Sequence, residues 1–174
     1  NALLARGMAV LSIDGPGQGE GEYDFSIRGN YETVAGPIID WLESRDDLDA
    51  ERVGIYGVSL GGYHAARAAC FEDRIRACVS VSGAYDWGAN WDNKSKLNRE
   101  VFRIRSHCAT MEEAKEKSKA ISLKGIAKNI TCPIYIVAGG LDQLTAVEAA
   151  EQIAAEVSGP KLLSIVEDGV HVCH

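Results

Sequence analysis

The sequence predicts an α/β fold, built on a mostly parallel sheet with helices on both faces and a cap-like insertion. Short apolar runs alternate with amphipathic segments of helical length. The runs are apolar throughout rather than at every second position, as in parallel strands that are buried on both faces. One interval is far longer than the other connections, which indicates an inserted segment.

The first elements follow in order along the chain. Asn1–Gly7 has the pattern of the last turns of a helix closed by a glycine, and the apolar run Met8–Ile13 predicts a buried strand. Asp14–Gly21 holds four glycines and a proline, which predicts a tight loop. Apolar residues at helical spacing predict a helix within Tyr31–Ser44, where Pro37 marks either the first turn or a kink.

The later elements alternate more regularly. Two helices are predicted, Leu60–Phe71 with small residues suited to packing on a sheet, and the Ala/Glu-rich Thr145–Val157. Four further apolar runs predict strands, namely Arg52–Tyr56, Ile75–Val81, Ile134–Ala138 and Lys161–Val166.

The interval between Ala84 and Thr131 breaks this alternation. It carries aromatic residues and then a charged helical run, Met111–Ala120. It is too long for a simple crossover, so we interpret it as a lid or cap on top of the sheet. We therefore assign residues 1–84 and 132–174 to the core and residues 85–131 to a cap-like insertion.

Composition and charge exclude several classes of function. The 174 residues are 46% hydrophobic and 25% charged, which is the balance of a globular domain. Lys and Arg number 18 against 25 Asp and Glu, for a net charge of −7. This charge argues against a nucleic-acid or anionic-membrane partner, and the apolar runs are too short to span a bilayer.

The cysteines indicate the compartment and bear on metal binding. The five cysteines are odd in number and include no CxxC pair, as in a reduced, cytoplasmic protein without a disulfide framework. His171, Cys173 and His174 lie close together, but no credible fourth ligand accompanies them. We expect no metal site and no cofactor.

The strongest chemical signal is the segment Gly57-Val58-Ser59-Leu60-Gly61, between a predicted strand and a predicted helix. A sharp strand-to-helix turn lifts the serine hydroxyl out of the sheet, and side chains at the flanking glycines would collide with the neighbouring strand and helix. The helix N-terminus favours developing negative charge. We predict that Ser59 is a nucleophile; the alternative is a serine that caps an ordinary helix.

A serine nucleophile needs a base within hydrogen-bond reach, and the base needs an acid to orient it. Asp142 follows the strand Ile134–Ala138, and His171 follows the strand Lys161–Val166. Both therefore fall at the carboxyl edge of a parallel sheet, where ligands bind in open α/β folds. We predict that His171 is the base and Asp142 the acid.

Several alternatives to this assignment stay open. Asp142 is also placed to cap a helix that begins near Leu144. The remaining alternatives are Asp86 as the acid, His174 as the base, and two histidines that we interpret as idle, His64 on the helix after Ser59 and His107 in the insertion.

The sequence also suggests how a substrate would be held. The backbone N–H of Leu60, directly after the serine, is the expected oxyanion donor. The usual second donor comes from a loop ahead of the helix that ends at Gly7, so we expect half an oxyanion hole in this chain. Tyr85, Trp87 and Trp91 are candidates for lining a substrate pocket, with packing of the cap onto the sheet as the alternative.

The order Ser59–Asp142–His171 resembles the α/β-hydrolase superfamily over nearly the whole chain. The motifs Asp14–Glu20, Gly57–Tyr63 and Asp168–His174 resemble a branch that contains 2,6-dihydroxypseudooxynicotine hydrolase, fungal chain-shortening hydrolases and fermentation-respiration switch esterase-like proteins. The resemblance implies cleavage of esters, or of carbon–carbon bonds in 1,3-dicarbonyl-type substrates. It also implies a helical domain ahead of the core.

From these observations we expect a serine hydrolase that forms an acyl-enzyme with a small carbonyl substrate. The alternatives are a non-catalytic binding or regulatory protein on the same fold, and an acyltransferase with the same three residues. We also expect a catalytic part cut at both ends, without N-terminal strands, that aggregates and is nearly inactive when expressed alone. A homodimer of the full-length protein is left open.

Overall fold

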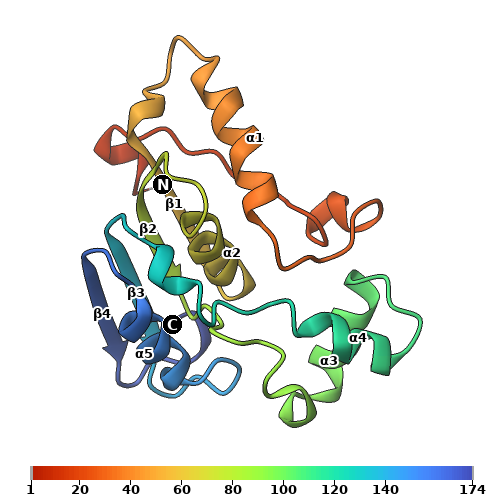
Figure 1. Cartoon of the computed structure of the whole chain (residues 1–174). Coiled ribbons are helices and arrows are strands. Elements are labelled where there is room, and N and C mark those ends of the chain that lie inside the picture. The colour runs from red at the N-terminus through yellow and green to blue at the C-terminus, as the bar shows by residue number, and fades with distance from the viewer. Residues whose placement is uncertain (1, 174) are drawn as a thin grey trace.

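A four-stranded parallel sheet forms the centre of the computed structural model, which describes residues 2–173 (Figure 1). The strands stand in chain order across the sheet: β1 (Val53–Val58), β2 (Ile75–Val81), β3 (Ile134–Gly139) and β4 (Lys161–Val166). These are the four later strands that the sequence predicts, within three residues at each end. The parallel α/β class is thereby confirmed.

The helices of the core lie against one face of this sheet. Helix α2 (Leu60–Ala69) contacts β1 and β2, and α5 (Val147–Glu156) contacts β3 and β4. Because the strands follow chain order, every right-handed crossover falls on the same side. The sequence predicts helices on both faces, but within residues 2–173 the helices α2 and α5 share one.

The covered face holds the core. Ser80 of β2 donates a hydrogen bond from Oγ to the carbonyl oxygen of Gly62 in α2, at 3.0 Å. Ile136 is the register neighbour of Ser80 and is buried, as is Ile153 of α5. Burying an aliphatic side chain of this size contributes about 1.5–3 kcal/mol, so these contacts fix both helices to the sheet.

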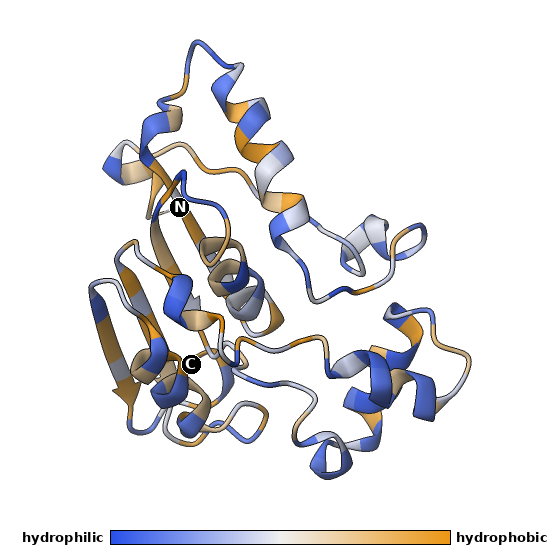
Figure 2. Ribbon diagram, viewed as in Figure 1, coloured by the Kyte–Doolittle hydropathy of each residue, from blue (hydrophilic) through white to orange (hydrophobic). Residues whose placement is uncertain are grey.

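The opposite face of the sheet is apolar and exposed. The register aligns Tyr56, Val79, Tyr135 and Leu162 in one row across all four strands. Tyr56 is 63% exposed and Leu162 is 59% exposed. Figure 2 shows the hydrophobic colouring of the strands. The strands are apolar on both sides, which is why the sequence predicts two covered faces.

The prediction of a strand at Met8–Ile13 is wrong for this structure. The run has no strand assignment, and four of its apolar side chains are 41–49% exposed. An extended apolar segment becomes a strand only when a neighbouring strand pairs with its backbone. Within residues 2–173 no strand pairs with this segment. The preceding turn does end as predicted, with Gly7 in the left-handed conformation at φ 75°.

Helix α1 (Glu32–Glu43) resolves the two interpretations of Pro37. The proline lies inside the helix, in its second turn, rather than at its start. Glu32, the first residue of the helix, accepts two hydrogen bonds from the Arg67 guanidinium of α2, each at 2.8 Å. This half-buried bidentate pair joins α1 to α2, and so to the sheet.

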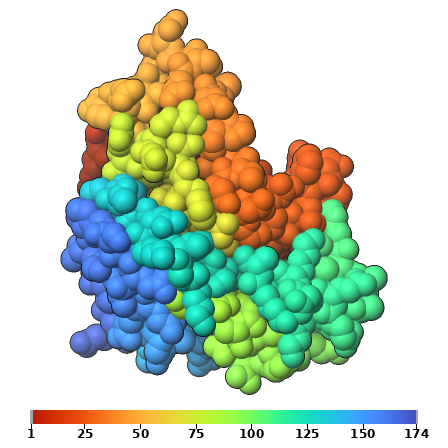
Figure 3. All heavy atoms as spheres, in the orientation of Figure 1, coloured from red at the N-terminus to blue at the C-terminus, as the bar shows by residue number. Residues whose placement is uncertain are grey.

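The interval after β2 forms a separate lobe with helices α3 (Lys96–Arg105) and α4 (Met111–Ser118). The lobe joins the core through a two-stranded stalk, in which Trp87 N donates to Ile121 O and Leu123 N donates to Tyr85 O. The lobe also contacts the N-terminal loop (Figure 3), where Lys117 Nζ donates to Ser26 Oγ at 2.9 Å.

Within residues 2–173, no helix combines the length and the apolar character that crossing a membrane requires.

Candidate active site

Ser59 stands on a strained turn between β1 and α2. Its backbone has φ 57° and ψ −121°, a conformation that residues with side chains rarely adopt. Such strain persists only where the surrounding structure enforces it, and it occurs most often at functional sites. The turn lifts the hydroxyl of Ser59 above the carboxyl end of β1, as the sequence predicts.

The glycines around Ser59 explain why the turn can be so tight. A Cβ atom at Gly57 would overlap the carbonyl group of Gly61, and one at Gly62 would come within 2.9 Å of Gly83 Cα. At Gly61, by contrast, a Cβ atom would meet nothing within 4 Å. The predicted collision is therefore correct for Gly57 but not for Gly61, and Gly62 is the second glycine that packing requires.

Three side chains from three loops meet at this edge of the sheet. Ser59 Oγ lies 2.8 Å from His171 Nε2, and His171 Nδ1 lies 2.8 Å from Asp142 Oδ2. The side chain of Asp142 is fully buried, and that of His171 is 22% exposed. The three residues predicted from chain order thus form one continuous chain of hydrogen bonds.

Asp142 is held from both sides. Its Oδ1 accepts hydrogen bonds from the backbone N–H groups of Leu144 and Thr145, at 2.8 and 3.0 Å. Burial opposes ionisation of the carboxyl group, but these bonds and the bond with His171 outweigh it, so the pKa of Asp142 lies below its usual value. Helix α5 begins at Val147, so Asp142 orders the turn ahead of the helix rather than capping it.

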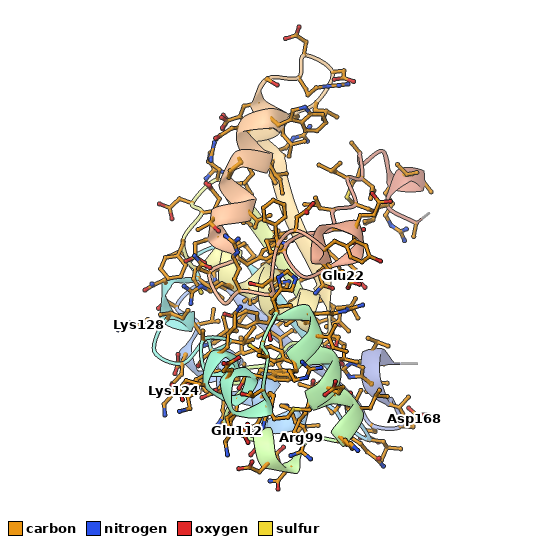
Figure 4. All side chains as sticks on the ribbon, turned by 90° about the vertical axis from the view of Figure 1, so that its right-hand side faces the viewer. Glu22, Arg99, Glu112, Lys124, Lys128 and Asp168 are labelled. Carbon is orange, nitrogen blue, oxygen red and sulfur yellow. The ribbon has the colours of Figure 1, made fainter. Side chains whose placement is uncertain are left out.

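The turn that carries Asp142 packs directly against the loop that carries His171. Leu141 N donates to Gly169 O at 2.9 Å, and Gly140 N donates to Val166 O at 2.8 Å. A Cβ atom at Gly139 or Gly140 would overlap the backbone of residues 167–170. Asp168 marks the His171 loop in Figure 4, well away from Lys124 and Lys128.

Leu60 opens helix α2, directly after the serine. The first N–H groups of a helix have no acceptor within the helix, and they favour negative charge. The backbone N–H of Leu60 is therefore available to an oxygen atom above Ser59. Its role as oxyanion donor stays a prediction.

The alternative residues lie elsewhere or outside the described part. The backbone of Asp86 forms a bridge with Ser122 in the stalk of the lobe. His64 is buried and stacked on Tyr31, and His107 Nε2 lies 2.6 Å from Glu22 O at the outer edge of the lobe. Figure 4 labels Glu22 at this junction. His174 lies outside the described residues.

Two of the three aromatic candidates are interior residues. Trp91 is 3% exposed and packs edge-on against Trp87. Tyr85 is also buried, and its hydroxyl donates a short hydrogen bond to Glu156 of α5. These contacts favour the packing role over contact with a substrate. Trp87 is half-buried beneath the Lys94 ammonium, and its contact with a substrate stays a prediction.

One contact of the site has no counterpart in the sequence analysis. The backbone N–H of Val172, next to His171, donates to Ser82 Oγ at 3.2 Å. Ser82 follows β2 and belongs to no motif, so residue pattern alone does not single it out. Within residues 2–173, His, Cys, Asp and Glu side chains form no group of three that could hold a metal ion.

Comparison with known proteins places the chain in a family. The sequence profile of the prolyl oligopeptidase family matches residues 1–167. The 2,6-dihydropseudooxynicotine hydrolase of Paenarthrobacter nicotinovorans is 34% identical over 176 residues, which cover 100% of this chain and 47% of that protein. Hydrolase ffsE of Aspergillus flavipes is 40% identical, over 78% of this chain and 40% of that protein.

Solved structures agree with this placement. The crystal structure of 2,6-dihydroxy-pseudo-oxynicotine hydrolase superposes with a TM-score of 0.86 at 32% identity, over 92% of this chain and 46% of that one. Acetyl xylan esterase 1 from Thermoanaerobacterium shares the fold with a TM-score of 0.64 at 19% identity, over 95% of this chain and 55% of that one. The chain spans about half the length of the curated relatives that it matches.

Proposed function

Because the chain belongs to the prolyl oligopeptidase family, within the α/β-hydrolase superfamily, we propose that it carries the catalytic residues of a serine hydrolase. The observation that supports this most directly is the continuous hydrogen-bond chain from Ser59 through His171 to Asp142. A serine hydroxyl paired with an oriented imidazole is the arrangement that nucleophilic catalysis requires.

In the proposed mechanism, Ser59 Oγ attacks a substrate carbonyl carbon while His171 Nε2 takes the hydroxyl proton. Asp142 keeps the second ring proton on Nδ1 and stabilises the imidazolium. The N–H of Leu60 stabilises the oxygen anion of the tetrahedral intermediate. His171 then protonates the leaving group, which departs and leaves an acyl-enzyme. Water, deprotonated by His171, attacks the acyl carbon and releases Ser59.

The proposed substrates are carbonyl compounds of two kinds. With an ester, the leaving group is an alcohol. With a 1,3-dicarbonyl-type substrate, the carbon–carbon bond breaks and the leaving carbon departs as an enolate, which His171 protonates. Named relatives include both 2,6-dihydropseudooxynicotine hydrolase and acetyl xylan esterase. The sequence motifs resemble the first of these more closely.

The test is covalent labelling of the full-length protein with a fluorophosphonate, followed by peptide mass spectrometry. We expect a single modified residue, Ser59, and no modification in Ser59→Ala. The same substitution should lower kcat for the best ester or 1,3-dicarbonyl substrate by about 10³-fold or more, with folding unchanged. A Ser122→Ala variant, which alters an exposed serine of the stalk, serves as the control.

Two outcomes would redirect the proposal. A wild-type protein that neither reacts with the probe nor turns over any carbonyl substrate would indicate a non-catalytic member of the superfamily. A labelled Ser59 with rapid transfer of the acyl group to an added alcohol, in preference to water, would indicate an acyltransferase.

A further inference from the structure

The end of β2 touches all three segments that carry the proposed catalytic residues. Val81 O accepts a hydrogen bond from Ser59 N at 2.8 Å. Ser82 N donates to Val137 O of β3, the strand that leads to Asp142, at 2.8 Å. Ser82 Oγ accepts from Val172 N, next to His171, at 3.2 Å. Two adjacent residues therefore connect the segments of the serine, the acid and the base.

Ser82 is built into this position at a conformational cost. It is 2% exposed, and its backbone has φ 49°, in the left-handed region that residues other than glycine seldom adopt. Val172 and Cys173 in the His171 loop also have positive φ, at 62° and 61°. Backbone of this kind stays in place only when its surroundings over-determine it. The hydroxyl of Ser82 supplies one such constraint to the His171 loop.

We propose that Ser82 is a positioning residue, whose hydroxyl sets the distance between His171 Nε2 and Ser59 Oγ. The inference rests on the proposed function and adds a residue to it. Without the hydroxyl, Val172 N loses its acceptor, and the loop is free to shift. A displacement of about 1 Å between reacting groups can lower a rate by roughly 10²-fold.

The experiment compares three variants of the full-length protein. Ser82→Ala removes the hydroxyl and keeps the strained backbone, whereas Ser82→Gly removes the hydroxyl and relieves the strain. Ser118→Ala is the matched control, because Ser118 is equally buried in α4 and its Oγ donates one hydrogen bond, to Lys115 O at 2.7 Å. Thermal unfolding identifies variants that fail to fold.

We expect both Ser82 variants to lower kcat by about 10-fold or more, with KM within about twofold of wild type and Ser118→Ala unchanged. The rate of fluorophosphonate labelling should fall in proportion. Wild-type kcat in Ser82→Gly would assign the effect to backbone strain and overturn the proposal. Equal rates in Ser82→Ala and Ser118→Ala would overturn it as well.

A spectroscopic measurement separates this inference from the proposed function. The proton between His171 Nδ1 and Asp142 Oδ2 should give a downfield signal in the proton NMR spectrum, identified by its loss in Asp142→Asn. If Ser82 positions the loop, Ser82→Ala shifts or broadens that signal, even in a protein that fails to react with the phosphonate. An unchanged signal together with an unchanged labelling rate would show that the hydroxyl does not position His171.

Discussion

The imidazole of His64 lies in the interior of the molecule, five residues beyond Ser59. Its ring stacks on Tyr31 with centroids 4.1 Å apart, and it is 5% exposed. Its Nε2 has no hydrogen-bond partner among residues 2–173. Burial lowers the pKa of His64 to about 4, because the charged form would lose its hydration.

This burial predicts a loss of stability in acid. The unfolded histidine takes up its proton near pH 6.5, whereas the folded one does so near pH 4. Between these values the unfolded state binds more protons, so the free energy of unfolding falls as the pH is lowered. We expect wild type to lose roughly 2 kcal/mol more than His64→Phe between pH 7.5 and 5. Urea unfolding at both pH values measures this, and parallel losses would refute it.

Asp142→Asn tests the buried carboxylate. The lowered pKa of Asp142 means that its ionised form stabilises the fold above the unfolded pKa of about 3.9, and that this contribution disappears as the pH falls through the folded pKa. The variant should therefore be less stable than wild type at pH 7, with the difference shrinking toward pH 3. Its kcat should fall by about 10³–10⁴-fold, because the imidazole loses its orienting partner. A pH-independent stability difference would contradict this account.

The chemically distinctive residues could be predicted from the sequence. A serine between two glycines at a strand-to-helix junction, and an acid and a histidine after later strands, bring three loops to one sheet edge. The sequence could not predict Ser82 or the roles of Gly62 and Gly140, because these depend on close approach between segments that are distant in the chain. The same limit applies to Trp91 and Tyr85, whose aromatic character alone does not distinguish packing from contact with a ligand.

At the scale of elements, the strand-to-helix turn gives a contrast between two glycines of one motif. Gly57→Ala places a methyl group on the carbonyl of Gly61, where only backbone can yield. We expect it to lower the free energy of unfolding by about 1–3 kcal/mol or more. Gly61→Ala enters open space within a helix and should be neutral or stabilising by up to about 1 kcal/mol. Denaturant unfolding of the two variants measures both effects, and equal destabilisation would refute the contrast.

The strands show where local pattern is sufficient and where it is not. Four apolar runs form strands because each has a neighbour in the sheet, and their order in the chain is also their order in space. Met8–Ile13 has the same apolar character but no neighbour among residues 2–173, and it stays irregular and exposed. Pairing is a property of two segments, so the apolar pattern of one segment predicts a strand only conditionally.

At the scale of the whole molecule, the exposed row on the sheet predicts self-association. Tyr56, Tyr135 and Leu162 present apolar surface in one plane, and contiguous patches of this kind drive association. Residues 1–174 expressed alone should form oligomers in light scattering. Leu162→Lys should reduce them, whereas Leu97→Lys, which alters an exposed leucine of α3, should not. A monodisperse monomer would contradict the prediction.

The stalk of the lobe also decides which part of this molecule is free to diversify. Its two ends are joined by the hydrogen bonds of Trp87 with Ile121 and of Tyr85 with Leu123. For the sheet, the lobe therefore closes like a short hairpin, and a longer or shorter lobe changes the closure entropy only slightly. A lineage can exchange the lobe's body for one of another shape while the hydrolytic machinery keeps its geometry. Substrate range and chemistry can thus evolve on different parts of the chain.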